Sequence, residues 1–157
     1  GSSISQGSNA TAPSETWPAI VARQADLDLV NLGFGGSSFV DPFMARLIRD
    51  TEADIISLKF GINIVNLDGM RRRVFIPALH GFLDTIRDGH PDTPILLMSP
   101  LYCGIHEDTP GPGNFDPSTF TTGQARFMAM GTPGDTALGR LTLQVVREAM
   151  RDVGGAV

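Results

Sequence analysis

The chain has 157 residues, a length that fits one domain and is sufficient for a hydrophobic core. Its hydrophobic fraction of 41% against 18% charged residues is typical of a folded globular protein and excludes a disordered chain. The formal charge of −5, with one lysine against eleven arginines, argues against nucleic-acid binding, which needs a basic face.

The cysteine content and the length of the apolar runs exclude further classes of protein. Cys103 is the only cysteine, so the chain forms no internal disulfide, and the residue is interpreted as a half-buried structural thiol. No apolar run approaches the roughly 18 residues that a membrane span needs. We therefore expect a soluble protein, cytoplasmic or secreted, whose compartment and oligomeric state the sequence leaves open.

Helices and strands alternate in the first half of the chain. A small, polar turn at its start precedes a predicted helix, which Ser14 caps and which runs through Trp17 and Ala25. Residues 27–32 are a short apolar run that predicts a buried strand, and the glycine-rich turn 33–38 follows it. Asp41-Pro42 provides an N-cap and a first-turn proline, which predict the start of the next helix.

The alternation continues in the second half. Residues 55–60 and 95–98 are predicted strands, and a helix is predicted between them over residues 70–87. Residues 102–131 have no sustained periodicity and are rich in glycine and proline, which indicates a long functional or mobile loop. A last helix is predicted to start at residues 132–135 and to continue through Met150.

Alternating strands and helices predict an α/β fold with a central parallel sheet and helices on both faces. In such sheets, ligands bind at the carboxyl ends of the strands. Three polar turns fall at such ends, namely residues 2–7, 33–38 and 61–66. We expect these turns to converge on one site.

The residues of the three turns suit a serine nucleophile. A hydroxyl nucleophile needs exposure on a fixed turn, hydrogen-bond donors for the developing oxyanion, and a base that takes its proton. Ser3 meets the first need, and a glycine amide of the second turn and the side-chain NH₂ of Asn63 meet the second. Each residue taken singly is more common in an ordinary turn or cap, so only their combination points to catalysis.

Three ordered blocks of the sequence resemble a known family. Gly1-Ser2-Ser3-Ile4, then residues 31–36, then Gly61-Ile62-Asn63 are similar to the first three blocks of the SGNH (GDSL-type) hydrolases. The branch with a first block of Gly-Ser-Ser-Ile-Thr-Gln-Gly is the most similar. Residues 13–18, Asp41-Pro42 and residues 90–95 match the same branch in their expected places, so the resemblance covers the whole chain.

This resemblance implies a flavodoxin-like three-layer sandwich and a serine ester hydrolase of the acylhydrolase or acetylesterase type, which works through an acyl-enzyme. Ser3 would be the nucleophile. The amides of Ser3 and Gly36 and the side chain of Asn63 would form the oxyanion hole. The resemblance implies a small-molecule or carbohydrate ester as substrate and no metal or organic cofactor.

The catalytic base of the family comes from a last block, Asp-x-x-His, in which the His deprotonates the nucleophile and the Asp orients the His. None of the three histidines fits, because Pro77, Arg87 and Cys103 stand three residues before His80, His90 and His106. We therefore expect residues 1–157 to be a single SGNH-like domain that lacks the first strand and the Asp-x-x-His block. The catalytic His and Asp are not found in the chain.

Two residues of the long loop and two other functions stay open. His106 and Tyr102 are candidates for the substrate side of the site, because long loops on rigid scaffolds often shape a pocket. One alternative is a non-catalytic, hydrolase-like fragment or binding module. Another is a flavodoxin-like phosphate or nucleotide binder that uses residues 2–7 as an anion cradle, although this turn has no P-loop lysine.

Overall fold

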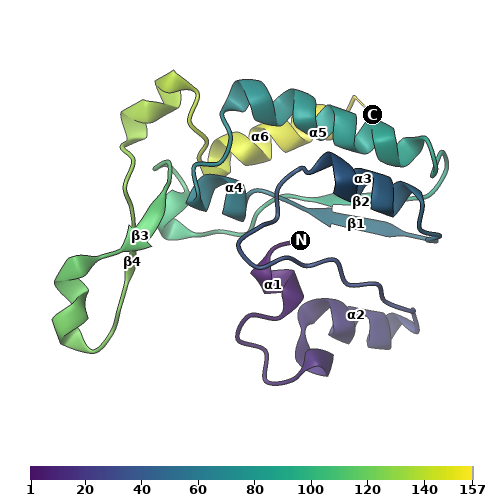
Figure 1. Ribbon diagram of the computed structural model, residues 1–157, viewed down its shortest axis with the longest axis horizontal. Coiled ribbons are helices and arrows are strands. Elements are labelled where there is room, and N and C mark those ends of the chain that lie inside the picture. The colour runs from purple at the N-terminus through teal and green to yellow at the C-terminus, as the bar shows by residue number, and fades with distance from the viewer. Residues whose placement is uncertain (157) are drawn as a thin grey trace.

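A computed structural model describes residues 1–156, so Val157, the last residue of the expected domain, lies outside the described residues. It contains both helices and strands, which confirms an α/β fold (Figure 1). In the described part of the chain, no helix is both long and apolar enough to cross a membrane. The α-helices are α1 (Ser3–Gln6), α2 (Trp17–Ala25), α3 (Pro42–Arg49), α4 (Ile62–Asn66), α5 (Arg72–Arg87) and α6 (Leu143–Gly154). The strands are β1 (Ile56–Lys59), β2 (Ile95–Met98), β3 (Gly113–Phe115) and β4 (Phe127–Ala129), and the 3-10 helices are η1 (Pro13–Glu15), η2 (Gly104–His106), η3 (Pro117–Thr122) and η4 (Pro133–Leu138).

Strands β1 and β2 form a parallel pair, in which Ile56 lies opposite Ile95 and Lys59 opposite Met98. Strand β2 is a short aliphatic run, whereas β1 alternates apolar and polar residues, as Ile-Ser-Leu-Lys. Both end near residues unsuited to a strand, because Gly61 closely follows β1 and Ser99-Pro100 follows β2. Helix α5 connects them, as a parallel pair requires. Two strands of the predicted parallel sheet are thus present among residues 1–156, and the prediction for residues 95–98 is confirmed.

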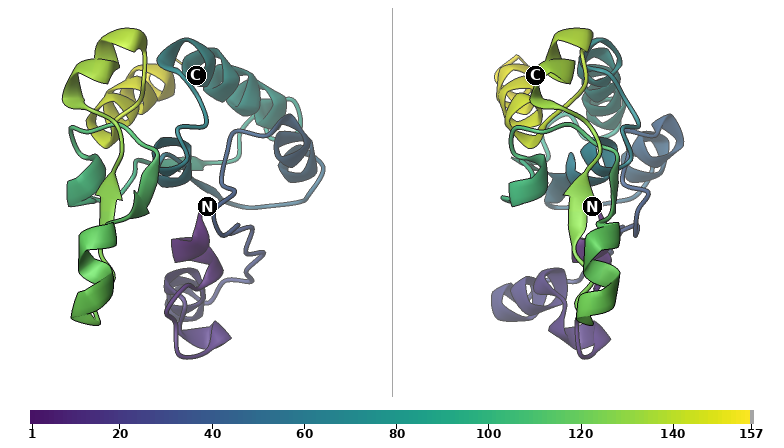
Figure 2. Two further views of the ribbon diagram at one scale, coloured as in Figure 1. Left: turned by 60° about the vertical axis from the view of Figure 1, so that its left-hand side comes forward. Right: turned by 90° about the vertical axis from the view of Figure 1, so that its left-hand side faces the viewer.

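The hydrophobic core lies where α3, α5 and α6 pack over one face of the β1–β2 pair (Figure 1). Strand β1 adds Ile56 and Leu58 to this core, and the rings of Phe60 and Phe82 meet edge to face with their centroids 5.2 Å apart. Helices α1 and α2 lie on the other side of the strands (Figures 1 and 2). The largest fully buried aromatic and aliphatic side chains are Phe75, Ile64, Leu79, Ile86, Leu141, Leu143, Val65, Val146 and Val153.

The prediction of a strand over residues 27–32 is wrong. A strand needs a neighbour that receives and donates its backbone hydrogen bonds, and no strand within residues 1–156 pairs with this segment. The nearest pairing is an isolated parallel bridge between Ser2 and Phe34. Leu29 and Val30 are therefore exposed, although their sequence pattern predicts burial.

The predicted C-terminal helix is divided into two. Gly139 ends η4 with a left-handed backbone, at φ 77°, which glycine adopts without steric cost. Helix α6 starts after Thr142, whose side chain accepts a 3.3 Å hydrogen bond from the Val145 amide as its N-cap. The apolar periodicity spans both helices, so it does not reveal this break.

The predicted long loop contains a β-hairpin that projects from the body of the molecule (Figure 2). Strands β3 and β4 pair antiparallel, and η3 forms the tip; we call residues 113–129 the hairpin arm. The rings of Phe115 and Phe127 face each other across the strand pair with centroids 4.4 Å apart. Both rings are exposed, so they stabilise the arm mainly through contact with each other.

A salt bridge joins the start of this loop to α6. Arg147 donates to both carboxylate oxygens of Glu107, at 2.6 and 2.9 Å, and its Nε donates to the carbonyl of Pro100 at 3.1 Å. The amide of Cys103 also donates to the Glu107 carboxylate, at 2.9 Å. These hydrogen bonds, those from Arg147 above all, hold the pKa of Glu107 below its ordinary value.

Leu79 and Leu47 provide a matched test of the core. Leu79 on α5 is fully buried, whereas Leu47 on α3 is 48% exposed. We expect Leu79→Ala to lower the free energy of unfolding by about 2–5 kcal/mol, because it removes buried methyl groups and leaves a cavity. Leu47→Ala should cost less than about 1 kcal/mol. Urea unfolding followed by circular dichroism measures both losses, and equal losses would contradict this core.

The salt bridge predicts an acid-dependent loss of stability. Because folding lowers the pKa of Glu107, the salt bridge stabilises the fold above the unfolded value of 4.5 and is lost as the pH falls through the lower folded value. We expect Glu107→Gln to lower the free energy of unfolding at pH 7 by about 1 kcal/mol. Urea unfolding at pH 7 and at pH 3 tests this, since the difference between wild type and variant must shrink at pH 3. A constant difference would show that the charge of Glu107 has no part in it.

Candidate active site

Ser3 is the first residue of α1, a helix of four residues. Ser2 precedes it with an extended backbone, and its carbonyl accepts from the amides of Ser5 and Gln6, at 2.9 and 3.0 Å. Gly7 ends the helix with a φ of 124°, which glycine tolerates. Ser3 is half-buried at the start of this short helix, where helical amides lack intrahelical partners.

Residues 31–36 pack directly against α1. The amide of Phe34 donates to the Gly1 carbonyl at 2.7 Å, and the side chain of Asn31 donates to the Ser5 carbonyl at 2.8 Å. The same Asn31 side chain accepts from the Gly33 amide at 3.0 Å. An added Cβ at Gly33 would lie 2.3 Å from the Gln6 nitrogen, so only glycine permits this approach. The first two predicted turns therefore lie in contact.

Two glycines follow Phe34, and the first of them lies beside Ser3. An added Cβ at Gly35 would lie 3.6 Å from Ser3 Cβ and 2.6 Å from Gln6 Oε1. Gly36 has a φ of 69°, in the left-handed region, and a Cβ there would meet nothing within 4 Å. Gly36 is thus an exposed backbone position that a substrate atom can approach.

Asn63 connects the third turn to the second. It lies on α4, is only 7% exposed, and its Oδ1 accepts a hydrogen bond from the Ser38 amide at 3.1 Å. A backbone amide can only donate, so the carboxamide oxygen faces Ser38 and the NH₂ group points elsewhere. The structure thus brings the three predicted turns together, through the Ser3–Gly35 and the Ser38–Asn63 contacts.

Trp17 and Gln6 also make contacts around α1 that the sequence analysis did not predict. Trp17 Nε1 donates to Ser5 Oγ at 3.2 Å, and the Gly35 amide donates to Gln6 Oε1 at 2.7 Å. Gln6 stands one helical turn after Ser3, and this spacing is the signal that could have identified it. The contact of Trp17 with Ser5 has no such signal, because it joins two separate elements.

Lys59 is a buried cation at the end of β1. Burial lowers its pKa. The sequence reading missed Lys59, because it lies within the apolar run of a predicted strand.

The three histidines have structural surroundings. His90 is buried, and its ring lies 3.0 Å from the Ile48 carbonyl and 3.2 Å from Thr93 Oγ1. His80 lies half-buried on α5. Within residues 1–156, no histidine hydrogen-bonds to Ser3.

His106 and Tyr102 differ sharply in exposure. His106 is fully buried, and burial lowers its pKa, so the neutral ring is favoured. Its Nδ1 lies 3.3 Å from the Thr109 carbonyl, which only accepts, and its Nε2 lies 3.1 Å from the Asn66 carboxamide at the end of α4. Tyr102 is 80% exposed. His106 therefore anchors the loop on α4, and Tyr102 stands on the surface of that loop.

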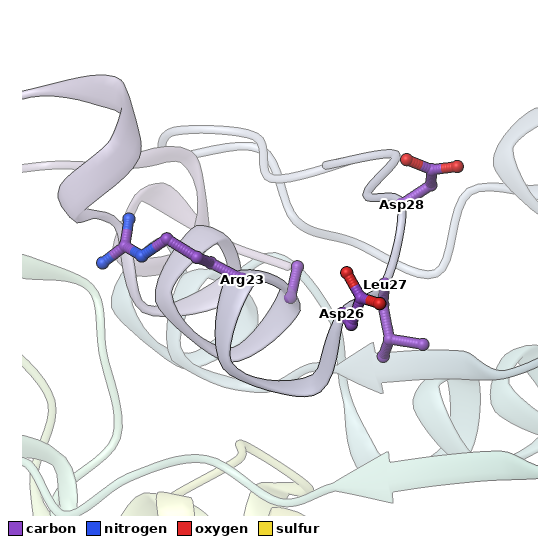
Figure 3. A pocket seen from close by; sticks show the side chains of 5 residues that line it. Arg23, Asp26, Leu27 and Asp28 are labelled. Carbon is purple, nitrogen blue, oxygen red and sulfur yellow. The ribbon is translucent and has the colours of Figure 1, made fainter.

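Two surface hollows lie away from the three turns. One, of about 320 Å³ at the end of α2, is drawn in Figure 3. Another, of about 530 Å³, lies beside His90. Neither is lined by Ser3, Gly36 or Asn63, so the turns meet at the surface outside both hollows. The first hollow is lined by Ala22, Arg23, Asp26, Leu27 and Asp28.

Similar structures match nearly the whole chain. The salicylyl-acyltransferase SsfX3 from a tetracycline biosynthetic pathway shares 34% identity with a TM-score of 0.75, over 99% of this chain and 37% of that one. A protein of Bacteroides ovatus ATCC 8483, assigned as a GDSL-like lipase, shares 24% identity with a TM-score of 0.65, over 99% of this chain and 36% of that one. The chain thus spans little more than a third of either structure. No curated protein matches it.

A family model matches the part of the chain that contains all three turns. The model is that of the GDSL-like lipase/acylhydrolase family, and it matches residues 1–103 of the 157. Ser3, Gly36 and Asn63 all fall within the matched range. The chain therefore belongs to the GDSL-like lipase/acylhydrolase family.

Proposed function

We propose that this protein is a serine ester hydrolase of the acylhydrolase or acetylesterase type, with Ser3 as its nucleophile. The observation that carries the proposal is the buried hydrogen bond from the Ser38 amide to Asn63 Oδ1, because it directs the NH₂ group of Asn63 away from Ser38. The contact between Gly35 and Ser3 supports it, because it brings the glycine-rich turn to the proposed nucleophile. Family membership supports an esterase- or acyltransferase-type enzyme.

The proposed reaction has two steps. Ser3 Oγ attacks the carbonyl carbon of the ester while a general base takes the hydroxyl proton. The tetrahedral intermediate then expels the alcohol, which receives that proton, and leaves an acyl-enzyme on Ser3. Water, deprotonated by the same base, attacks the acyl carbon and releases the carboxylic acid and the free serine. No cofactor takes part in these steps.

The proposed oxyanion hole consists of the amides of Ser3 and Gly36 and the NH₂ group of Asn63. The left-handed backbone and open surroundings of Gly36 favour this role, since an oxygen can reach its amide without meeting a side chain. The burial of Asn63 favours it as well, because a donor held in place loses little entropy when it binds the oxyanion. Each such donor contributes roughly 100- to 1000-fold in rate.

The remaining parts of the site follow from the same proposal. The general base is a group other than His80, His90 and His106, since none of them contacts Ser3 among the described residues. Tyr102 is placed on the substrate side, with His106 acting indirectly by anchoring the loop that carries it. We also propose that residues 1–157 belong to one domain with a flavodoxin-like three-layer sandwich.

Acyl transfer is a second candidate, favoured by the 34% identity with a salicylyl-acyltransferase. It uses the same acyl-enzyme, but the hydroxyl or amine of an acceptor replaces water in the second step. Product analysis with p-nitrophenyl acetate, in the presence and absence of an added alcohol, separates the two. An acetylated alcohol as main product indicates transfer, and acetate alone indicates hydrolysis.

Ser3→Ala tests the nucleophile. In the full-length protein, we expect this variant to lose the turnover of p-nitrophenyl acetate at least about 1000-fold, because no oxygen remains to form the acyl-enzyme. Ser14→Ala, which removes the hydroxyl of an exposed serine outside the three turns, is the control for loss of a hydroxyl. Turnover by Ser3→Ala at the wild-type rate would overturn the proposal, and turnover by neither protein above the uncatalysed rate would favour a non-catalytic binding module.

Asn63→Asp tests the oxyanion donor at nearly constant shape. The aspartate still accepts from the Ser38 amide, so the fold should be kept, but it has no NH₂ to donate. We expect kcat to fall about 100- to 1000-fold with little change in KM. Steady-state kinetics and urea unfolding measure the two effects. An unchanged kcat would remove Asn63 from the site.

A further inference from the structure

The glycine pair Gly35-Gly36 lacks side chains that could fix its backbone. Both residues are exposed, and Gly36 is in a left-handed conformation that only a few residue types adopt freely. Glycine loses more conformational freedom on folding than any other residue. If Gly36 supplies an oxyanion donor, some other group must therefore hold this pair in one orientation.

Gln6 makes the shorter of two side-chain hydrogen bonds to Gly35, since Ser37 Oγ donates to the Gly35 carbonyl at 3.3 Å. Its Oε1 accepts from the Gly35 amide at 2.7 Å, across 29 residues of sequence. Gln6 stands on α1 three residues after Ser3, so the two side chains lie on the same face of the helix. An added Cβ at Gly35 would lie 2.6 Å from Gln6 Oε1 and 3.6 Å from Ser3 Cβ, which places Gly35 against both.

This contact selects which amide faces the substrate. An amide that donates to Gln6 is directed at α1 and is not free to bind an oxyanion. The hydrogen bond also fixes the peptide plane between Phe34 and Gly35, and this restricts the next peptide, whose N–H belongs to Gly36. The neighbouring hydrogen bond from Gly33 to Asn31 holds the start of the turn in the same way but does not reach Gly35.

We propose that Gln6 is a positioning residue, which orients the oxyanion hole by holding the Gly35 amide so that the Gly36 amide faces the tetrahedral intermediate. The inference rests on the proposed function and extends it by one residue. Gln6 does not touch the substrate. It couples the geometry of the oxyanion hole to the helix that carries the nucleophile, so that both move together.

The test compares three variants of the full-length protein. Gln6→Met keeps the size and flexibility of the side chain but has no oxygen acceptor, and Gln6→Glu keeps an acceptor in the same place. Gln24→Met is the matched control, because Gln24 is an exposed residue of α2 with no contact to the turn. The substrate is p-nitrophenyl acetate. The transition-state analogue is phenylboronic acid, which forms a tetrahedral adduct with a serine hydroxyl.

We expect Gln6→Met to lower kcat about 10- to 100-fold with KM within about twofold, and to raise the inhibition constant of phenylboronic acid by a similar factor. Gln6→Glu should recover most of the loss, and Gln24→Met should match wild type. A wild-type kcat in Gln6→Met, a loss confined to KM, or a failure of Gln6→Glu to recover would each overturn the inference. Activity retained by Ser3→Ala would overturn the proposed function itself.

Amide hydrogen exchange by NMR gives a readout that is independent of turnover. Removing the acceptor should speed exchange of the Gly35 amide at least about tenfold in Gln6→Met, with the amides of α5 unchanged. Gln6 is exposed, so this variant should fold as wild type does. Unchanged exchange at Gly35 would mean that Gln6 does not hold this amide in solution, and it would overturn the inference whatever the kinetics.

Discussion

The hydrogen bond from the Ser38 amide to Asn63 is the contact on which the arrangement of the site depends. It joins the N-terminal part, with α1 and residues 31–38, to α4, which belongs to the core under α5 and α6. Because both partners are buried, breaking this bond would leave an amide and a carboxamide oxygen without a partner, at a cost of about 1–3 kcal/mol. The bond therefore ties the proposed nucleophile to a well-packed scaffold.

The two sides of the β1–β2 pair are packed in different ways. The side of the β1–β2 pair that faces α3, α5 and α6 is a continuous hydrophobic core. The other side carries α1 and α2, and α1 is held against residues 31–36 by hydrogen bonds and by close approach at Gly33. Such contacts are directional, so they fix geometry closely even where they bury little apolar area.

The sequence predicted the elements whose structure depends on neighbouring residues, but it did not predict those that depend on a partner far along the chain. The strand at residues 95–98 follows from an aliphatic run between prolines, and it is correct. Residues 27–32 have an equally good apolar pattern, but a strand is a property of a pair and no partner strand lies within residues 1–156. Similarly, the burial of His106 depends on Asn66, 40 residues away, which no local pattern reveals. The three turns were expected to converge because strand ends share an edge of a sheet, and they are connected even though only residues 61–66 follow a strand within residues 1–156. The contacts of Asn63 and Gln6 were not predicted, because each side chain accepts from a backbone amide, which almost any residue offers.

Trp17 gives the molecule an optical property that follows from its position. It is the only tryptophan of the 157 residues, and its indole donates to Ser5, two residues after Ser3. Its fluorescence therefore reports on α1 and its surroundings, while the far-ultraviolet dichroism comes mainly from α5 and α6, the longest helices of the core. The chain thus carries one spectroscopic label for the proposed nucleophile and another for the scaffold, with no need for an added dye.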